Sequence, residues 1–176
     1  MSDKKVLAVF ASDKGAGDVK RADIMSKAGH FLAGKGFNFV VLAQNGEFCV
    51  PFITSARSAG ADIKIIADEE FKIPKKLADI ELKKFKTSAE RYAMIDELSD
   101  VFVGLPCSLL SAKFLFEVWV ENQGKKPVIL LNKNRSFEFM RGFVQDVVSH
   151  KVRHVEKQIQ HADNIEDLYN RIKKLV

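Results

Sequence analysis

The stretch "SDVFVGLPCSLLSAKFLFEVWVENQGKKPVILLN", residues 99–132, decides the fold of this chain. It opens with an apolar run at 100–105 and turns at Pro106. Apolar residues then follow helical spacing over 109–123, and a second apolar run closes the stretch at 126–132. Two strands that are apolar on both faces, joined by a helix, are typical of a parallel sheet covered by helices. We therefore predict a strand–turn–helix–strand unit here.

The same alternation of strands and helices runs along the rest of the chain. Further strands are expected at 5–11, 37–43, 61–67 and, as a short edge strand, within 155–162, and further helices at 19–36, 51–60, 87–99, 136–150 and 163–175. Residues 68–84 predict a loop with a helical piece. This alternation predicts an α/β fold, namely a Rossmann-like three-layer αβα sandwich with a mostly parallel sheet, in a single domain spanning residues 1–176.

Several of the expected helices begin at residues that cap helices. Thr87 with Glu90, and Asp163 with Glu166, have the spacing of a capping box, in which two side chains satisfy N–H groups of the first turn. Pro51 suits a first helical turn, where the missing N–H group has no partner to lose. We therefore expect helices to begin beside these residues.

Composition indicates a globular protein of the cytoplasm that spans no membrane. Hydrophobic residues make up 47% of the 176 residues, yet no run approaches the length of a transmembrane helix. The N-terminal apolar run from Val6 to Ala11 predicts a first strand rather than a signal peptide. The two cysteines, Cys49 and Cys107, make no disulfide framework, which favours a reducing compartment.

The charge permits binding to phosphates without indicating a nucleic-acid partner. The net charge is +5, and the basic residues are spread along the chain, most densely at 72–86, where they predict a solvated surface. No recognition helix or RNA-binding signature is present, so we expect no sequence-specific binding to nucleic acid. His30, His150, His154 and His161 lack the spacing of metal ligands, and neither a metal nor a cofactor is expected.

Ligands of such sheets bind beyond the carboxyl ends of the strands, near the point where the strand order reverses. The turns that should converge there are 12–18, 44–51 and 105–111. Their polar residues are therefore the first candidates for a site.

The segment from Arg91 to Val148 resembles the Lonely Guy family, phosphoribohydrolases that activate cytokinins and are often labelled lysine decarboxylases. "SDVFVGLP" at 99–106 and "KPVILLN" at 126–132 match the family's second half, and "VLAVFASDKG" resembles its first strand and Ser-rich turn. The resemblance covers nearly the whole chain. It implies a Rossmann-like fold, a homodimer, and a role for Arg91 beside a catalytic glutamate.

The departures from the family pattern fall on its chemistry. Where the family reads PGGxGTxxE, Cys107 and Ser108 replace two glycines, Leu110 replaces a third, and Phe114 replaces the catalytic glutamate. The second family motif, GGGxxGLM, corresponds to residues 43–51, where Gly46 survives. Because both phosphate loops have lost glycines together, the sequence favours an altered or abandoned catalytic site.

Glu117 is the acid that could replace the missing glutamate. It lies one helical turn after Phe114 and matches a second family glutamate, so Arg91 and Glu117 are the candidate catalytic residues. Its side chain starts about 4.5 Å further along the helix axis. A misplacement of even 1 Å can slow a reaction about a hundredfold. The sequence therefore favours loss of efficient hydrolysis.

The start of the helix at 109–123 keeps the components of an anion site. Ser108 and Ser111 offer hydroxyl groups there, the helix start offers unpaired N–H groups, and Lys113 adds a positive charge. Gly46 from the second loop completes this set of candidate phosphate-binding residues. The serine of the first turn, Ser12, which lies beside Asp13, belongs to it as well. The alternative is that the serines only cap the helix and that Leu109, Leu110 and Phe114 belong to the core.

The sequence thus predicts a protein that binds a nucleotide or another small phosphorylated ligand and lacks efficient hydrolysis. One alternative is a weak phosphoribohydrolase acting on nucleoside 5′-monophosphates. Another is a scaffold for protein or nucleic acid with a closed pocket.

The helices at 87–98 and 109–123 carry more large apolar residues than one sheet face can bury, which predicts a homodimer through these helices.

Overall fold

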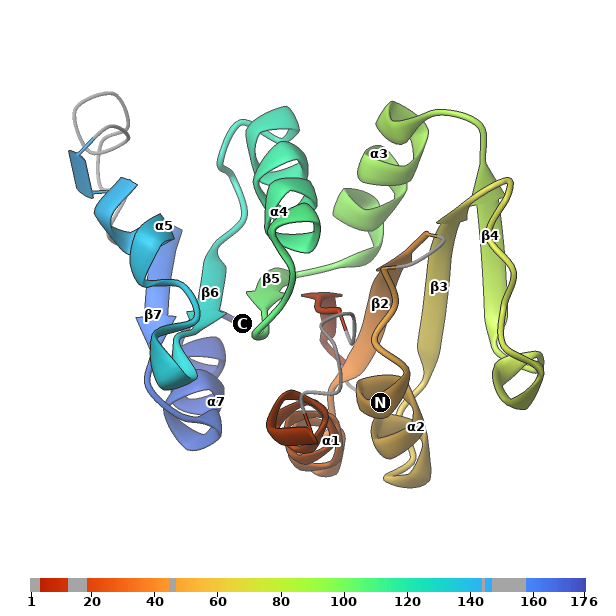
Figure 1. Cartoon of the computed structure of the whole chain (residues 1–176), viewed down its shortest axis with the longest axis horizontal. Helices are drawn as coiled ribbons and strands as arrows, with labels where there is room; N and C mark the ends of the chain where they lie inside the picture. Colours follow the sequence, from red (N-terminus) through yellow and green to blue (C-terminus); the bar gives the residue numbers. More distant parts are fainter. Residues whose placement is uncertain (1–3, 13–18, 45–46, 144, 147–157) are drawn as a thin grey trace.

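A seven-stranded parallel sheet forms the centre of the molecule (Figure 1). The computed structural model describes residues 4–12, 19–44, 47–143, 145–146 and 158–176. The strands are β1 (Val6–Phe10), β2 (Asn38–Ala43), β3 (Ile63–Asp68), β4 (Glu81–Phe85), β5 (Val101–Gly104), β6 (Val128–Leu131) and β7 (Ile159–Ala162). Their order is β4-β3-β2-β1-β5-β6-β7, and every neighbouring pair is parallel.

Helices cover both faces of this sheet. They are α1 (Val19–Gly34), α2 (Val50–Ser58), α3 (Ser88–Leu98), α4 (Leu109–Glu121), α5 (Glu138–Phe143) and α7 (Ile165–Lys173). In Figure 1, α1, α2 and α7 lie below the sheet, and α3, α4 and α5 lie above it. The predicted Rossmann-like three-layer α/β fold is therefore confirmed, and its sheet is wholly parallel.

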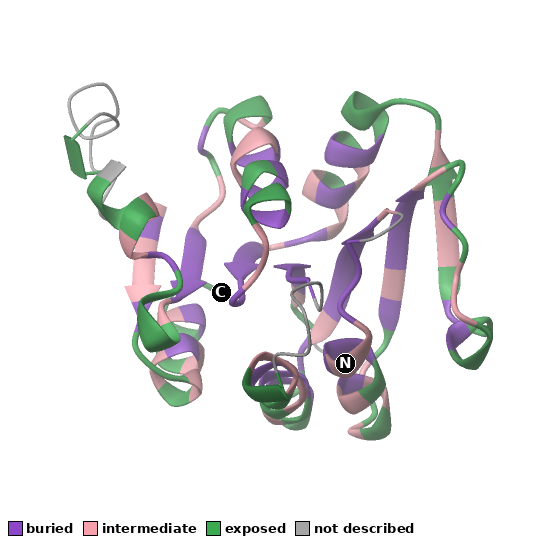
Figure 2. Ribbon diagram, viewed as in Figure 1, coloured by how far each residue is buried: buried purple, intermediate pink, exposed green. Residues whose placement is uncertain are grey.

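Two apolar cores, one on each face, hold the layers together. The core below the sheet includes Met25 and Leu32 of α1, Phe52 of α2 and Leu168 of α7. The core above it joins α3 and α4 to the other side of the same strands. Figure 2 shows the consequence, because the inner strands are buried while the outer faces of the helices are exposed. This double burial explains why the strands read as continuous apolar runs.

The expectation for residues 68–84 was incomplete. A short 3₁₀ turn at 75–77 supplies the helical piece, but Glu81–Phe85 forms strand β4 at one edge of the sheet. Its sequence, "ELKKF", carries charged residues on an exposed edge and so lacks the apolar run that marks the inner strands. Lysines on such an edge also discourage pairing with a second chain.

One of the two expected capping boxes is present as predicted. The Thr87 hydroxyl accepts a hydrogen bond from the Glu90 N–H at 3.2 Å, and the Glu90 carboxylate accepts one from the Thr87 N–H at 3.0 Å. These reciprocal bonds fix the start of α3.

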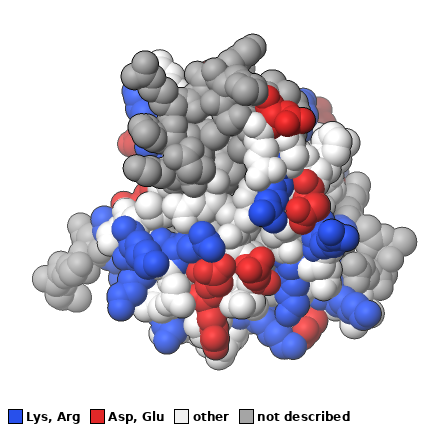
Figure 3. All heavy atoms as spheres, turned by 90° about the vertical axis from the view of Figure 1, so that its left-hand side faces the viewer, with Lys and Arg blue, Asp and Glu red and all other residues white. Residues whose placement is uncertain are grey.

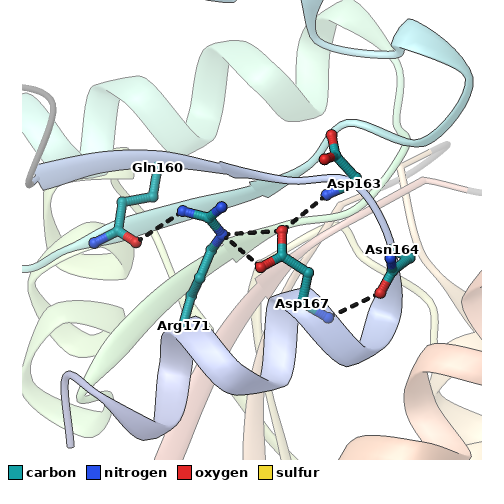
Figure 4. Close-up of polar contacts among 5 residues, drawn as sticks. All are labelled: Gln160, Asp163, Asn164, Asp167 and Arg171. Atoms are coloured by element: carbon teal, nitrogen blue, oxygen red, sulfur yellow. Dashed lines mark hydrogen bonds and ion pairs between the residues drawn. The ribbon is translucent and has the colours of Figure 1, made fainter.

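The second expected box was assigned one residue too early. Asn164, not Asp163, caps α7, and its side-chain oxygen accepts from the Asp167 N–H at 2.9 Å (Figure 4). The Asp167 carboxylate in turn accepts from the Asp163 N–H at 3.2 Å, and both of its oxygens lie 3.0 Å from Nε of Arg171. Asn and Asp cap helices about equally well, so sequence preference could not separate these neighbours.

The helix expected at 136–150 begins at Glu138, after a 3₁₀ turn at 133–135. Residues 144 and 147–150 lie outside the described part of the chain. No helix among the described residues is long and apolar enough to cross a membrane. On the described part of the face nearest β7, basic and acidic side chains are interspersed (Figure 3).

Candidate functional site

The carboxyl ends of β1, β2 and β5 lie side by side, as a ligand site at this edge requires. Val9 of β1 pairs with Val41 of β2, and Phe10 pairs with Gly104 of β5. Because β1 stands between the other two strands, the loops that follow β2 and β5 can meet over its end. The prediction that β2 and β5 flank β1 is therefore confirmed.

The start of α4 is organised by two serines. Ser108 is the N-cap residue, and its hydroxyl oxygen accepts a hydrogen bond from the Ser111 N–H at 3.1 Å. Ser111 is 5% exposed and occupies the third position of the helix. Each serine hydroxyl still has its own proton to donate to an acceptor beyond the helix start.

That acceptor is the carboxylate of Glu47, from the loop after β2. Glu47 Oε2 accepts hydrogen bonds from the Ser108 hydroxyl at 2.6 Å and from the Ser111 hydroxyl at 2.7 Å. Glu47 is only 8% exposed. The two hydroxyl donors and the positive end of the α4 dipole compensate its carboxylate for the loss of contact with water. The helix start thus holds an anion that the chain itself supplies.

Sequence reasoning did not identify Glu47. It stands next to Gly46 in the segment aligned with the second family motif, where attention falls on lost glycines. The separation of 61 positions between Glu47 and Ser108 carries no spacing signal that would link them. A lone acid between apolar residues, in "GEFCV", was the only sign.

Phe114 closes the space behind this carboxylate. The ring is 8% exposed and belongs to the core above the sheet. A cavity of about 10 Å³ remains between Phe114, Phe10, Ser111 and Glu47. That volume is at the lower limit for one water molecule and far below that of a phosphate group.

The other hydrophobic and basic residues of this helix start face outward. Leu109 is 79% exposed and Leu110 is 38% exposed, so these two residues lie outside the core that the alternative interpretation assigned to them. Lys113 is exposed, forms an ion pair with Glu117 at 3.3 Å, and lies over the Phe114 ring at 5.9 Å from its centroid. In this structure the positive charge of Lys113 is therefore paired with the negative charge of Glu117 on the same helix.

Glu117 is engaged by a neighbouring helix as well. The Tyr92 hydroxyl of α3 donates a hydrogen bond to Glu117 Oε2 at 2.6 Å. Burial of the phenol, and then this bond to a carboxylate, raise the pKa of Tyr92 above its usual range. The phenol thus remains a donor to Glu117 across the neutral pH range.

Arg91 lies in the interior, close to the carboxyl end of β3. Its side chain is 9% exposed, and its Nη1 lies 3.8 Å from Oδ2 of Asp68, the last residue of β3. Its Nη2 donates to the Ser88 hydroxyl at 2.8 Å. Among the described residues, Nε and Nη1 of Arg91 and Oδ1 of Asp68 are buried without a hydrogen-bond partner. Arg91 is thus a buried cation with unused donors.

The remaining candidates from the turns differ in what the structure shows of them. Gly46 and Asp13 lie outside the described residues, whereas Ser12 is fully buried just after the end of β1. Cys49 and Cys107 carry reduced thiols. Burial raises the pKa of Cys107 to about 12, and the nearby Glu47 carboxylate acts in the same direction against the opposing charge of Arg21. Cys107 is therefore a protonated, weakly reactive thiol at neutral pH.

A much larger cavity, of about 590 Å³, lies at the other end of the strands, where the strands begin. It is lined at the amino ends of the strands by residues such as Val6, Asn38 and Ile63, and by the ion-paired Arg57 and Asp79. In open parallel sheets ligands bind at the carboxyl edge. This second cavity therefore gives a natural point of comparison for any binding experiment. Within the described ranges, no cluster of His, Cys, Asp and Glu could hold a metal ion.

The strand order, the parallel pairing and a helix start directed at an anion define a Rossmann-like α/β protein. No protein-family model matches the sequence, and no curated protein matches it. The molybdenum cofactor carrier protein of Chlamydomonas reinhardtii has a similar structure, with a TM-score of 0.73 at 16% identity, covering 98% of each chain.

Two further solved structures are similar over nearly the whole chain. The molybdenum cofactor binding protein of Rippkaea orientalis has a TM-score of 0.69 at 18% identity and covers 99% of this chain and 98% of its own. DNA processing protein A of Helicobacter pylori, described for its binding of single-stranded DNA, has a TM-score of 0.60 at 15% identity and covers 97% and 80%. At these identities the similarity establishes the fold.

Proposed function

We propose that this protein binds a small phosphorylated ligand, such as a nucleotide, at the carboxyl edge of the sheet, and that it lacks efficient hydrolysis. We place it among Lonely Guy-like proteins of the cytoplasm. The observation that carries the proposal is Arg91, a buried guanidinium with unused donors at the edge where ligands of this fold bind.

A buried donor without a partner is costly, at about 1–3 kcal/mol and more for a charged group. Arg91 has two such nitrogens, Nε and Nη1, while Asp68 at 3.8 Å supplies an ion pair but no hydrogen bond to them. Phosphate oxygens are strong acceptors that match the geometry of a guanidinium group. A phosphorylated ligand would therefore satisfy donors that the protein leaves unused.

The missing acid supports binding without hydrolysis. Cleavage of an N-glycosidic bond passes through a positively charged centre that a carboxylate must stabilise, or through a water that it must activate. Phe114 can do neither. Glu117 is already bonded to Tyr92 at 2.6 Å and paired with Lys113 at 3.3 Å, so it is poorly placed to take over the role.

The structural neighbours are compatible with a binding role. Two of them are named for carrying or binding the molybdenum cofactor, and one for binding single-stranded DNA. Each of these descriptions concerns a bound partner rather than a reaction. A carrier-type role for this chain is thus our preferred interpretation of the similarity.

The test is isothermal titration calorimetry with AMP, GMP, inorganic phosphate and unphosphorylated adenosine. We expect heat with the phosphorylated ligands and none with adenosine, and at least a tenfold loss of affinity in Arg91→Ala. Arg57→Ala is the matched control, because it removes the same charge beside the cavity at the amino edge. Loss of binding in Arg57→Ala with normal binding in Arg91→Ala would place the ligand at the wrong edge for this proposal.

Catalysis is tested separately. Incubation with AMP or related monophosphates should release no more ribose 5-phosphate than a blank without protein. Clear turnover that disappears in Glu117→Gln would instead establish the weak phosphoribohydrolase.

A second candidate function is a scaffold with a closed pocket. Glu47 bonded to both serines, and Phe114 packed behind it, favour this alternative. It predicts no heat and no thermal shift with any phosphorylated ligand. Retention of a protein partner by the purified chain would then be the informative measurement.

We also propose a homodimer, although through a surface that shares only α4 with the one that the sequence suggested. Tyr92, Phe114 and Trp119 are buried within one chain and need no partner. The outer face of α4 and α5 is the better candidate, because Leu109, Val120 and Phe139 are 79%, 64% and 80% exposed there. Light scattering should give twice the mass of one chain, and Val120→Asp should shift it to a single chain. A monomer at micromolar concentration would contradict this assembly.

A further inference from the structure

The Glu47 carboxylate occupies the place that an external anion would take at the start of α4. It accepts from two hydroxyls at 2.6 and 2.7 Å and faces the N-terminal end of a thirteen-residue helix. Hydroxyl donors combined with a helix N-terminus are the usual components of a phosphate site. Here a bound carboxylate already shows that this position attracts a negative charge.

We propose that Glu47 is an intramolecular competitor that closes this anion site and sets its affinity for phosphorylated ligands. The inference rests on the proposed function and concerns the regulation of that same edge of the sheet. A phosphate monoester binds at Ser108 and Ser111 only when the Glu47 side chain has turned away, and the resting protein has the carboxylate in place.

Simple exclusion supports the competition. Each serine hydroxyl has one proton to donate, and both protons are directed to Glu47 Oε2. The adjoining cavity of about 10 Å³ leaves no room for a phosphate beside the carboxylate. The two anions would also repel each other in a buried setting. Ligand and Glu47 therefore cannot occupy the site together.

The competitor is the side chain of Glu47 rather than its backbone. The Glu47 N–H donates to the Gln44 carbonyl at 2.9 Å, and the Gln44 N–H donates to the Glu47 carbonyl at 3.2 Å. The next residue, Phe48, is buried and packs against Phe71 with ring centroids 5.0 Å apart. Because the main chain is held on both sides, rotation of the side chain is the movement that frees the serines.

The consequence is a measurable loss of affinity in the native protein. If the open state is populated at one part in ten or less, the apparent affinity falls by about tenfold or more. Removing the carboxylate should restore the full affinity of the open site. Glu47→Ala should therefore bind phosphorylated ligands more tightly than the native chain, which is the opposite of what loss of a ligand-binding residue would do.

The experiment is calorimetric titration of inorganic phosphate and AMP, at constant ionic strength, into the native chain, Glu47→Ala, Glu47→Ser and Glu47→Ala/Ser111→Ala. Glu121→Ala is the matched control, because it removes one exposed carboxylate from the far end of α4. We expect Glu47→Ala to gain at least tenfold in affinity, and the added Ser111→Ala to abolish that gain. Glu121→Ala should leave the affinity unchanged.

The outcomes separate this inference from the proposed function. Binding of AMP by the native chain without any gain in Glu47→Ala overturns the competitor and leaves the proposed function intact. No binding by the native chain, together with binding by Glu47→Ala, supports the competitor and rejects the proposed function of the native protein. If Glu47→Ala fails to fold by circular dichroism, Glu47→Ser decides, because it also removes the carboxylate, and an unchanged affinity in that variant overturns the inference.

Discussion

Replacement of the buried Arg91 together with its half-buried partner Asp68 distinguishes a functional arginine from a structural one. In the double variant Arg91→Met/Asp68→Asn, the side chains remain similar in length while both charges disappear. If the pair serves the fold, its removal should lower the free energy of unfolding of the protein. Removal of a pair retained for a ligand should not, because the unused hydrogen-bonding groups of the pair already burden the unliganded fold.

The magnitude follows from the contacts. The variant removes the two unpartnered donors of Arg91, each worth about 1–3 kcal/mol when left unsatisfied, whereas asparagine keeps an oxygen at position 68. It loses the hydrogen bond to Ser88 at 2.8 Å and the ion pair at 3.8 Å, together roughly 2–4 kcal/mol. The two contributions nearly cancel. We therefore expect a double variant that is as stable as the native chain or more stable by about 1 kcal/mol, which is about 2–4 °C in melting temperature for a chain of this size.

Urea denaturation gives the required free energy of unfolding, provided that the slope is unchanged. Both single variants should be less stable than the double variant, because each leaves one charge without its partner. Binding of AMP should be lost in the double variant. A loss of more than about 2 kcal/mol in the double variant would show that Arg91 serves the fold, and the reasoning from unused donors would be refuted.

Two further predictions concern packing and pH. In Gly29→Ala the new Cβ would lie 2.5 Å from the Phe52 carbonyl oxygen, so α1 and α2 must separate, and thermal melting should show a loss of about 1–3 kcal/mol. Gly34→Ala in the same helix meets no atom within 4 Å and should be neutral or stabilising. The pKa of Cys107 is about 12 in the fold against an ordinary value of 9.0, so its contribution to stability is complete below pH 9 and is lost as pH rises toward 12. The raised pKa of Tyr92 acts in the same direction, and Cys107→Ala should flatten the alkaline decline measured by urea denaturation.

The fold could be predicted from the sequence because its signal is carried by continuous segments. The runs at 100–105 and 126–132 are largely apolar, and each inner strand is buried on both faces. Strand β4 was missed because an edge strand needs no such run, and its lysines resemble those of a loop. The cap of α7 was predicted one residue too early because Asp163 and Asn164 are chemically similar candidates.

The candidate site was predictable only in its donors. Ser108 and Ser111 stand at the start of a recognisable helix, so their hydroxyl groups could be assigned to the carboxyl edge from sequence. The acceptor Glu47 comes from another loop, and the Asp68 that faces Arg91 comes from another strand. Pairings across the sheet depend on strand order and side-chain direction, which local pattern does not specify. The roles of these residues in binding remain predictions.

The position of β1 has a consequence for how the chain folds. Among the seven strands of this sheet, β1 comes first along the chain, yet it lies in the middle of the sheet, and its two neighbours come from very different distances along the chain. Its pairing of Val6 with Asn38 closes a short loop, whereas its pairing of Leu7 with Val101 brings together residues from opposite halves of the sequence. Long-range pairings of this kind slow folding. During synthesis β1 to β4 can assemble as a half-sheet, but the second edge of β1 has no partner until residues 101–104 have emerged. Until then that edge presents unpaired backbone N–H and C=O groups with which another chain could pair.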